Sequence, residues 1–286
     1  MPLDNTEFKA LVSLLEDPDT QIYQQIEDKL LSTGMEAIPF LEESWEQSFD
    51  PLQQSRIESV IHKIQFDQIK QDLSIWKLSN QDNLLDALLI INRYQYPSFD
   101  EQWVHNVLSE LRRDCWYYLM YEMSPLEKVR LLNNVIFRDY GLMGNTQDYH
   151  SPQNSYIHKV LESKRGNPIS LACIYSIVAQ KLDIPIYGVN LPRHFVLAYM
   201  ENNSKEALFY INVFNRGQVI RLHDLHAFLE QLNLPPSDEY ILPCSNLEIV
   251  KRVLRNLMSS YQKLEKEEKR KEIEILLKIM EGANNR

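Results

Sequence analysis

Hydrophobic residues recur at helical spacing through the N-terminal part of the chain. Between Phe8 and Ile64 they form four stripes of apolar positions three or four residues apart, the pattern of amphipathic helices. The segment Asp17-Pro18-Asp19 and Gly34 interrupt the stripes, as turn residues do. We therefore predict a region of short helices in sequential pairs that covers residues 1–80.

The most apolar segment of the chain follows Gly166-Asn167-Pro168 and predicts a buried central helix. Proline suits the first position of a helix, because its fixed φ matches the helix and its missing N–H needs no partner there. Asn167 can then cap the helix. The apolar positions cover well over half of the helix circumference, so we expect burial on most sides. These positions are Ile169, Leu171, Ala172, Cys173, Ile174, Ile177, Val178 and Leu182.

Runs rich in β-branched and aromatic residues follow the central helix and predict an antiparallel sheet. Asp183 and Pro185 end the helix, and a polar turn separates the second run from the third. We expect the central helix to pack on this sheet. The three runs cover residues 186–191, 194–200 and 207–214, and a short fourth strand covers residues 219–222.

The length of the polar turn predicts the register of the second and third strands. If this hairpin folds about Asn203, His194 lies opposite Asn212 and both side chains point to the same face. A slip of one residue would break this arrangement. A histidine beside an asparagine, facing the start of a buried helix, is the base-and-orienter half of a cysteine-nucleophile site. The helix N-terminus is where a thiol pKa would be lowered.

Other periodic segments predict further helices around this core. A loop at residues 141–152, rich in Gly, Asn and Asp and flanked by Tyr140 and Tyr149, is interpreted as a wall of any cleft, the alternative being a plain connection. Ser124-Pro125-Leu126-Glu127 has the pattern of a capped helix start. Residues 237–243 are expected to form a linker. The helices are predicted at residues 84–94, 99–120, 125–137, 222–232, 247–264 and 271–280.

Composition and charge exclude several classes of partner. Hydrophobic residues make up 44% of the chain and charged residues 24%, which is ordinary for a soluble globular protein. The formal net charge of -10 argues against a nucleic-acid or anionic-membrane surface, since phosphate groups are neutralised by clustered Lys and Arg. No apolar stretch approaches the ~20 residues of a membrane span. The first residues lack the pattern of a signal peptide, so we expect a cytoplasmic protein.

Cysteine and histidine spacing gives no metal or cofactor signature. Cys115, Cys173 and Cys244 lie far apart in the sequence and lack metal-ligand spacing, so we expect free thiols. His223 and His226, with Asp224 between them, can bind a metal if they are helical, but we interpret them as the start of a surface helix. No glycine-rich phosphate loop is present, and we expect no cofactor.

Several motifs resemble one protein family. The segment from Gly166 to Pro185, followed by Pro192-Arg193-His194-Phe195 and by Tyr210-Ile211-Asn212-Val213-Phe214-Asn215-Arg216-Gly217, resembles the transglutaminase-like core of the bacterial SirB-like family. The upstream segment from Phe137 to Asn145 resembles the same family. This resemblance implies the fold of the papain-like cysteine-protease superfamily.

The resemblance implies a site in which one essential residue is replaced. Transglutaminase-like enzymes are expected to carry Cys, His and Asp in that order, with the Cys opening the central helix. Pro168 occupies the Cys position of this chain and has no nucleophile. His194 matches the His position. Asn212 stands at the Asp position, where it can still orient an imidazole, as in papain-like enzymes.

Two other residues of this helix carry side chains that can act as nucleophiles. Cys173 lies five positions beyond Pro168, about 7.5 Å along the helix axis and turned by roughly 140°. Because cysteine is among the most often buried residues, we interpret Cys173 as a core residue, with the nucleophile as the alternative. Ser170 lies in the first turn of the helix and would need an adjacent base.

These observations predict an α+β protein with three parts. A helical N-terminal region (residues 1–80) resembles HEAT-like repeats, a transglutaminase-like core with its leading helices covers residues 81–235, and a tetratricopeptide-like helical hairpin covers residues 236–286.

We expect a non-catalytic protein, a pseudoenzyme, that binds a peptide or protein in the remnant cleft. The alternative is a cysteine-dependent amide hydrolase or acyl transferase that uses Cys173, His194 and Asn212. Regulation of gene expression through a partner is a third possibility, which rests on family analogy alone. The residues expected to line the cleft are Asn167, Pro168, Arg193, His194, Asn212 and Tyr149.

Overall fold

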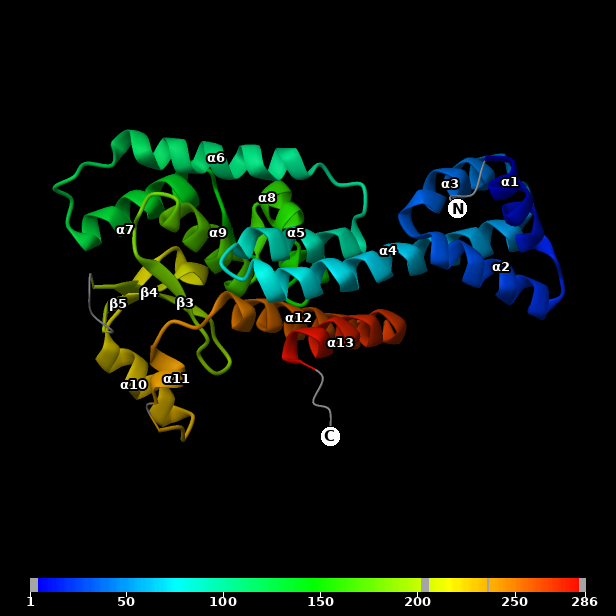
Figure 1. Cartoon of the computed structure of the whole chain (residues 1–286). Helices are drawn as coiled ribbons and strands as arrows, with labels where there is room; N and C mark the ends of the chain where they lie inside the picture. The colour runs from blue at the N-terminus through cyan, green and yellow to red at the C-terminus, as the bar shows by residue number, and fades with distance from the viewer. Residues whose placement is uncertain (1–4, 202–205, 236, 283–286) are drawn as a thin grey trace. The chain divides into compact units, whose positions relative to one another are not determined.

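The computed structural model describes residues 5–201, 206–235 and 237–282 of the chain (Figure 1). The chain divides into two compact units, Met1–Asp72 and Leu73–Arg286, and each is described by itself. The second unit contains every residue that the sequence predicts for the functional site.

The first unit is helical, as the apolar stripes predict. Asp19 caps its second long helix, because the Asp19 carboxylate accepts a 2.7 Å hydrogen bond from the Gln21 N–H. Fully buried Leu15, Leu30 and Leu41 lie in its core. Its helices are α1 (Asn5–Ser13), η1 (Leu14–Glu16), α2 (Thr20–Thr33), η2 (Gly34–Ala37), α3 (Ile38–Gln47) and the first part of α4 (Pro51–Ser79).

The second unit surrounds one helix, α9 (Pro168–Gln180), with other helices and a small sheet (Figure 1). The expected linker at residues 237–243 instead contains a short helix, α11 (Asp238–Ile241). The structure confirms helices at the other predicted positions. They are α5 (Leu84–Gln95), α6 (Glu101–Tyr118), α7 (Pro125–Asn133) with the π-helical turn η3 (Asn134–Asp139), α10 (Leu222–Gln231), α12 (Asn246–Lys263) and α13 (Glu267–Glu281). The structure adds a further helix, α8 (Ile157–Ser163), and the short turns η4 (Pro152–Ser155) and η5 (Val213–Asn215).

Four antiparallel strands form the main sheet, which confirms the α+β prediction. Their order follows the sequence, and α9 packs against the first two strands. The opposite face of the sheet carries Val196, Ala198 and Tyr210, which form a buried cluster with Leu225 and Leu229 of α10. The sheet therefore lies between α9 and α10. The strands are β3 (Ile186–Val189), β4 (Val196–Met200), β5 (Ala207–Asn212) and β6 (Gln218–Ile220).

The predicted register of the β4–β5 hairpin is wrong by two residues. Leu197 pairs with Ile211, so the position opposite Asn212 is Val196, and His194 precedes β4 altogether. A register shift between Tyr199 and Met200 accounts for part of this difference, since a bulge adds a residue to one strand only. Asn203, about which the fold of the hairpin was predicted, lies outside the described residues.

The central helix α9 is buried along almost its whole length, as predicted. Every residue from Ile169 to Ala179 is buried. Besides the sheet, α6, α8 and α12 pack against it. Helix α9, whose first turn is expected to belong to the functional site, therefore also forms the centre of the hydrophobic core of this unit.

A two-stranded parallel pairing fixes the loop that precedes η4. Strand β1 (Met143–Gly144) pairs with β2 (Arg165–Gly166), immediately before α9. Any side chain at Gly144 would collide with the ring of Phe214, so only glycine allows this close approach. The sequence pattern did not predict these short strands, because two residues give no periodicity.

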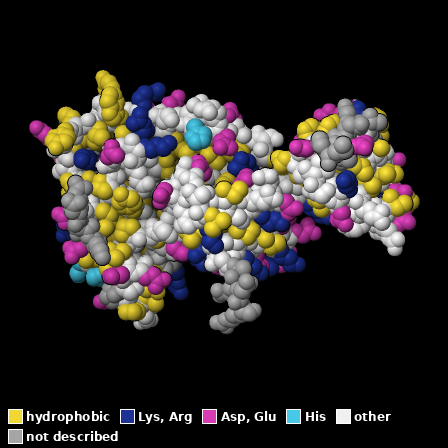
Figure 2. Space-filling model, viewed as in Figure 1, with side chains coloured by type: hydrophobic (Ala, Val, Ile, Leu, Met, Phe, Trp, Pro, Cys, Tyr) yellow, Lys and Arg dark blue, Asp and Glu magenta, His cyan; other side chains and the backbone are white. Residues whose placement is uncertain are grey.

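The end of α6 exposes a group of large side chains. Tyr121 is fully exposed, and hydrophobic side chains are visible at this end of α6 in Figure 2. The other members are Trp116, Tyr117, Tyr118 and Met120. Exposed apolar patches of this kind are typical of contact surfaces.

Candidate functional site

The first turn of α9 is closed by a reciprocal cap. The Asn167 Oδ1 accepts a 2.9 Å hydrogen bond from the Ser170 N–H, and the Ser170 Oγ accepts one of 3.1 Å from the Asn167 N–H. The Ser170 hydroxyl also donates to the Asn167 carbonyl at 3.1 Å. Pro168 is the first helical residue, as predicted. The Ser170 hydroxyl is thus buried and hydrogen-bonded as both acceptor and donor, and its proton goes to the Asn167 carbonyl instead of to a base that could activate the oxygen.

A network of amide side chains ties the preceding loop to this cap. The Asn167 Nδ2 donates a 2.8 Å hydrogen bond to the Ser155 Oγ, and both residues are buried. Asn145 donates to the Asn154 Oδ1 at 2.9 Å, and the Asn154 Nδ2 donates to the carbonyls of Asp148 (2.7 Å) and Tyr149 (3.1 Å). The loop is therefore an ordered structure that presents Tyr149, whose side chain is partly exposed.

The structure places His194 in the turn between β3 and β4. Arg193, directly before it, has a left-handed backbone conformation with φ of 62°, and both residues are exposed. The imidazole packs edge-to-face against the Phe228 ring of α10, with 4.8 Å between ring centroids. Although the residue as a whole is exposed, its neighbours partly desolvate the imidazole, and this desolvation and then the charge of Arg252 lower the pKa of His194 below its usual value. Both influences favour the neutral form of the imidazole.

The structure gives Asn212 a different partner from the one predicted. It ends β5, and its Oδ1 accepts a 3.2 Å hydrogen bond from the Asn215 N–H, which caps η5. Its strand position is paired with Gln218. Among the described residues no hydrogen bond joins Asn212 to His194, so the expected base-and-orienter pair is not assembled.

Cys173 lies inside the core, in the second turn of α9. Its side chain is 2% exposed, and burial raises the pKa of the thiol far above its usual range. Cys244 lies close enough to raise the Cys173 pKa further, and its own pKa is raised by burial to about 11. A thiol that is buried and protonated is not a nucleophile, because the thiolate is the reactive form.

Sequence reasoning missed a residue of α12 that lies near two predicted residues. Arg252 is half-buried, and its charge lowers the pKa of His194. The electrostatic influence of Tyr149, in turn, raises the pKa of Arg252. Arg252 makes no hydrogen bond or ion pair with any residue that the structure describes. We call Tyr149, His194 and Arg252 the Arg252 cluster. The available signal was a single arginine beside the apolar stripe of α12, formed by Ile249 and Val253.

The structure offers no obvious metal centre in its described part. Within residues 5–201, 206–235 and 237–282, no group of three or more His, Cys, Asp or Glu side chains could hold a metal ion. The Asp224 carboxylate instead accepts a 3.2 Å hydrogen bond from the Arg221 N–H at the start of α10, and His223 is exposed. The interpretation of these residues as a helix start is therefore confirmed.

No helix in the described ranges has the length and hydropathy that a membrane span requires.

Comparison with known proteins gives relatives in bacteria and animals. The chain is 31% identical over 188 residues to a UPF0162 protein of Xylella fastidiosa, covering 62% of this chain and 64% of the relative. It is 27% identical over 146 residues to a UPF0162 protein of Vibrio cholerae, covering 51% of the chain and 53% of the relative. F-box only protein 21 of Mus musculus is 30% identical over 105 residues, which are 35% of the chain and 17% of that protein. These matches therefore span only part of each relative.

A family model matches most of the second unit. The search of solved structures gave no match. The model described as the transglutaminase-like superfamily matches residues 102–255, more than half of the chain. This stretch runs from α6 to Arg255 in α12, so it includes α9, the sheet and the Arg252 cluster. The chain therefore belongs to the transglutaminase-like superfamily.

Proposed function

We propose that this protein is a non-catalytic member of its superfamily that binds an acidic segment of a peptide or protein at the Arg252 cluster. The narrower assignment to the SirB-like bacterial family, on the motifs around Gly166 and His194, is part of the same proposal. The single observation that carries it is the contrast between a first helical turn without a nucleophile and a half-buried arginine without a partner.

The chemistry of α9 supports the loss of catalysis. Pro168 stands at the position where superfamily enzymes are expected to carry the catalytic cysteine, and it has no reactive group. Ser170 is fixed in the cap, and Cys173 is buried with a raised thiol pKa. His194 has neither a nucleophile nor Asn212 among its described hydrogen-bond partners. Acyl transfer needs a nucleophile within reach of its base, and these residues do not supply that pair.

The electrostatics of Arg252 support an acidic ligand. Burial of the guanidinium and then the charge of the neighbouring Arg255 lower the pKa of Arg252, against a smaller opposing influence of Tyr149. No described carboxylate forms an ion pair with Arg252. Arg255 has its own partner, Glu281, at 2.8 Å. A partly desolvated guanidinium gains most from a carboxylate that binds it with two parallel hydrogen bonds. Tyr149 and His194 add a hydroxyl and a neutral imidazole beside it.

Selection from a library of displayed peptides against the full chain tests the proposal. We expect the selected peptides to be enriched in Asp and Glu, and their affinity to fall about tenfold in Arg252→Gln, because a charge-assisted pair is lost. Arg255→Gln is the matched control, since it removes the same charge from α12 at a position paired with Glu281. Its affinity should stay close to that of the wild type.

The same peptides test the absence of catalysis. We expect neither cleavage of the selected peptides nor incorporation of a labelled amine into their glutamine side chains. Cleavage or amine incorporation that His194→Ala abolishes would show an enzyme and would overturn the proposal. Selected peptides without acidic residues, or an equal loss of affinity in the two arginine variants, would also contradict it.

A further inference from the structure

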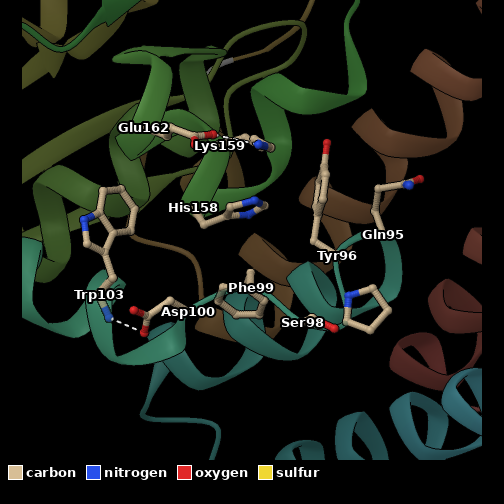
Figure 3. A pocket seen from close by; sticks show the side chains of 10 residues that line it. Gln95, Tyr96, Ser98, Phe99, Asp100, Trp103, His158, Lys159 and Glu162 are labelled. Carbon is tan, nitrogen blue, oxygen red and sulfur yellow. Dashed lines mark hydrogen bonds and ion pairs between the residues drawn. The ribbon is translucent and has the colours of Figure 1, made fainter. Parts of the chain in front are cut away.

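A pocket lies between the α5–α6 connection and α8, within the second unit. It has a volume of about 530 Å³ and shares no lining residue with the Arg252 cluster. Figure 3 shows Trp103 and Tyr96 on opposite sides of His158, with Phe99 and Asp100 on the side of α6. The His158 ring lies 4.4 Å from the Tyr96 ring and 5.2 Å from the Phe99 ring, measured between centroids. Three aromatic side chains and an imidazole thus line one hollow.

The hydrogen bonds of His158 fix which ring nitrogen can accept. The Asn92 side chain faces the His158 backbone N–H at 3.3 Å, and because a backbone N–H only donates, the facing atom is the Oδ1 acceptor. The same Oδ1 lies 2.7 Å from His158 Nδ1, so Nδ1 must carry the proton. Burial lowers the pKa of His158 to about 4, which keeps the ring neutral at pH 7. His158 Nε2 is therefore an acceptor, and no described residue donates to it.

The charged residues of the pocket leave one carboxylate without a cation. The Lys159 Nζ lies 2.7 Å from Glu162 and 5.2 Å from the centre of the Tyr96 ring, so the charges of this lysine and glutamate offset each other. Asp100 accepts a 2.9 Å hydrogen bond from the Trp103 N–H at the start of α6. No lysine, arginine or histidine in the described residues pairs with Asp100. The pocket thus has a net negative charge, an imidazole acceptor and aromatic faces.

We propose that this pocket binds a guanidinium group, as carried by an arginine side chain of a partner. A guanidinium is planar and stacks on aromatic rings such as Trp103 and Phe99, and its fork of N–H groups suits the Asp100 carboxylate and His158 Nε2 together. An anion is disfavoured, because the one lysine of the pocket is already paired. The inference does not rest on the proposed function, since the two sites are lined by different residues.

Titration of the full-length, ¹⁵N-labelled chain with Nα-acetyl-arginine methylamide tests this inference. The indole N–H signal of Trp103, identified by its absence in Trp103→Phe, reports on the pocket. We expect a saturable shift of this signal with the arginine probe. The citrulline analogue has the same shape without the charge and should bind about fivefold more weakly. Equal affinity for the two probes, or no saturable shift, would overturn the inference.

Two variants at neighbouring positions distinguish a direct contact between Asp100 and the guanidinium from a general effect of negative charge near the pocket. Asp100→Asn keeps the helix cap, because Asn caps as well as Asp, and should weaken the arginine probe about threefold. Glu101→Gln removes the same charge one residue later, outside the pocket lining, and should leave the affinity unchanged. An unchanged affinity in Asp100→Asn, or an equal loss in both variants, would contradict the proposed contact.

Discussion

The start of α9 and the Arg252 cluster use polar side chains in opposite ways. At the start of α9, the side chains of Asn167, Ser155 and Ser170 satisfy one another and are all buried. In the Arg252 cluster, a half-buried guanidinium has no partner among the described residues, and the His194 ring packs edge-to-face against Phe228. Buried polar groups that are fully paired hold a structure together, whereas unpaired ones are available to a ligand. The polar side chains at the start of α9 are therefore engaged with one another, whereas the Arg252 guanidinium is not engaged by any described residue.

The largest effect of this difference should follow from Asn167→Ala. The variant removes the helix cap and leaves the buried Ser170 N–H and Ser155 hydroxyl without partners, so we expect a loss of about 3 kcal/mol in the free energy of unfolding. Urea unfolding of the full chain measures it. Ser124→Ala, which removes the exposed cap of α7, is the matched control and should cost about 1 kcal/mol. If the two variants cost the same, the buried network has no special role.

A smaller loss should follow from Ser155→Ala. The Asn167 Nδ2 loses its acceptor but keeps its place in the cap, so the expected cost is about 1.5 kcal/mol. Ser163→Ala removes an exposed hydroxyl that donates to the Lys159 carbonyl, and its unfolding free energy should change by less than about 0.5 kcal/mol. Thermal or urea unfolding of this pair measures both values. A cost for Ser155→Ala no larger than that of Ser163→Ala would weaken the comparison.

Stability should hardly change in Arg252→Gln. Because the guanidinium makes no described hydrogen bond or ion pair, its removal should alter the free energy of unfolding by less than about 0.5 kcal/mol without ligand. This result would separate a binding residue from a structural one, since the same variant is expected to lose affinity for acidic peptides. A loss of several kcal/mol would assign Arg252 to the core instead.

The pKa of His194 should rise in the same variant. The charge of Arg252 lowers this pKa in the wild type, so its removal moves the value up, although burial still holds it below the usual 6.5. A histidine with a lowered pKa resists protonation in the folded state, so the folded protein loses stability as pH falls below about 6.5. That acid loss should be smaller in Arg252→Gln. NMR titration of the His194 ring measures the shift, and an unchanged pKa would place Arg252 too far away.

Local signals predicted the structural half of this comparison well. The cap by Asn167 and the first position of Pro168 depend on adjacent residues, and the burial of α9 follows from its composition. The capped start of α7 at Ser124 was predicted in the same way, and the structure confirms it. These features could be predicted because each depends on a few neighbours in the sequence.

The Arg252 cluster could not be predicted, because it depends on contacts between residues that are distant in the sequence. Arg252 comes from α12, which was expected to be part of a separate hairpin but packs on α9. Phe228 of α10 is the aromatic partner of His194. The residues around either of them do not indicate this contact. Part of the register error arose at a β-bulge between Tyr199 and Met200, which no apolar pattern marks. Asn212 was assigned to His194 through that register, and the structure pairs it with the turn at Asn215.

Alkylation of Cys173 by iodoacetamide in the native protein tests the central claim most directly. Mass spectrometry follows the labelling of each cysteine as a function of pH. Because burial raises the thiol pKa, we predict no labelling of Cys173 across neutral and mildly alkaline pH until denaturant is added. Cys244, which is only partly buried in the chain, serves as the internal reference. Fast labelling of Cys173 at pH 7 that is lost in His194→Ala would reveal an activated thiolate and would contradict a site without a nucleophile.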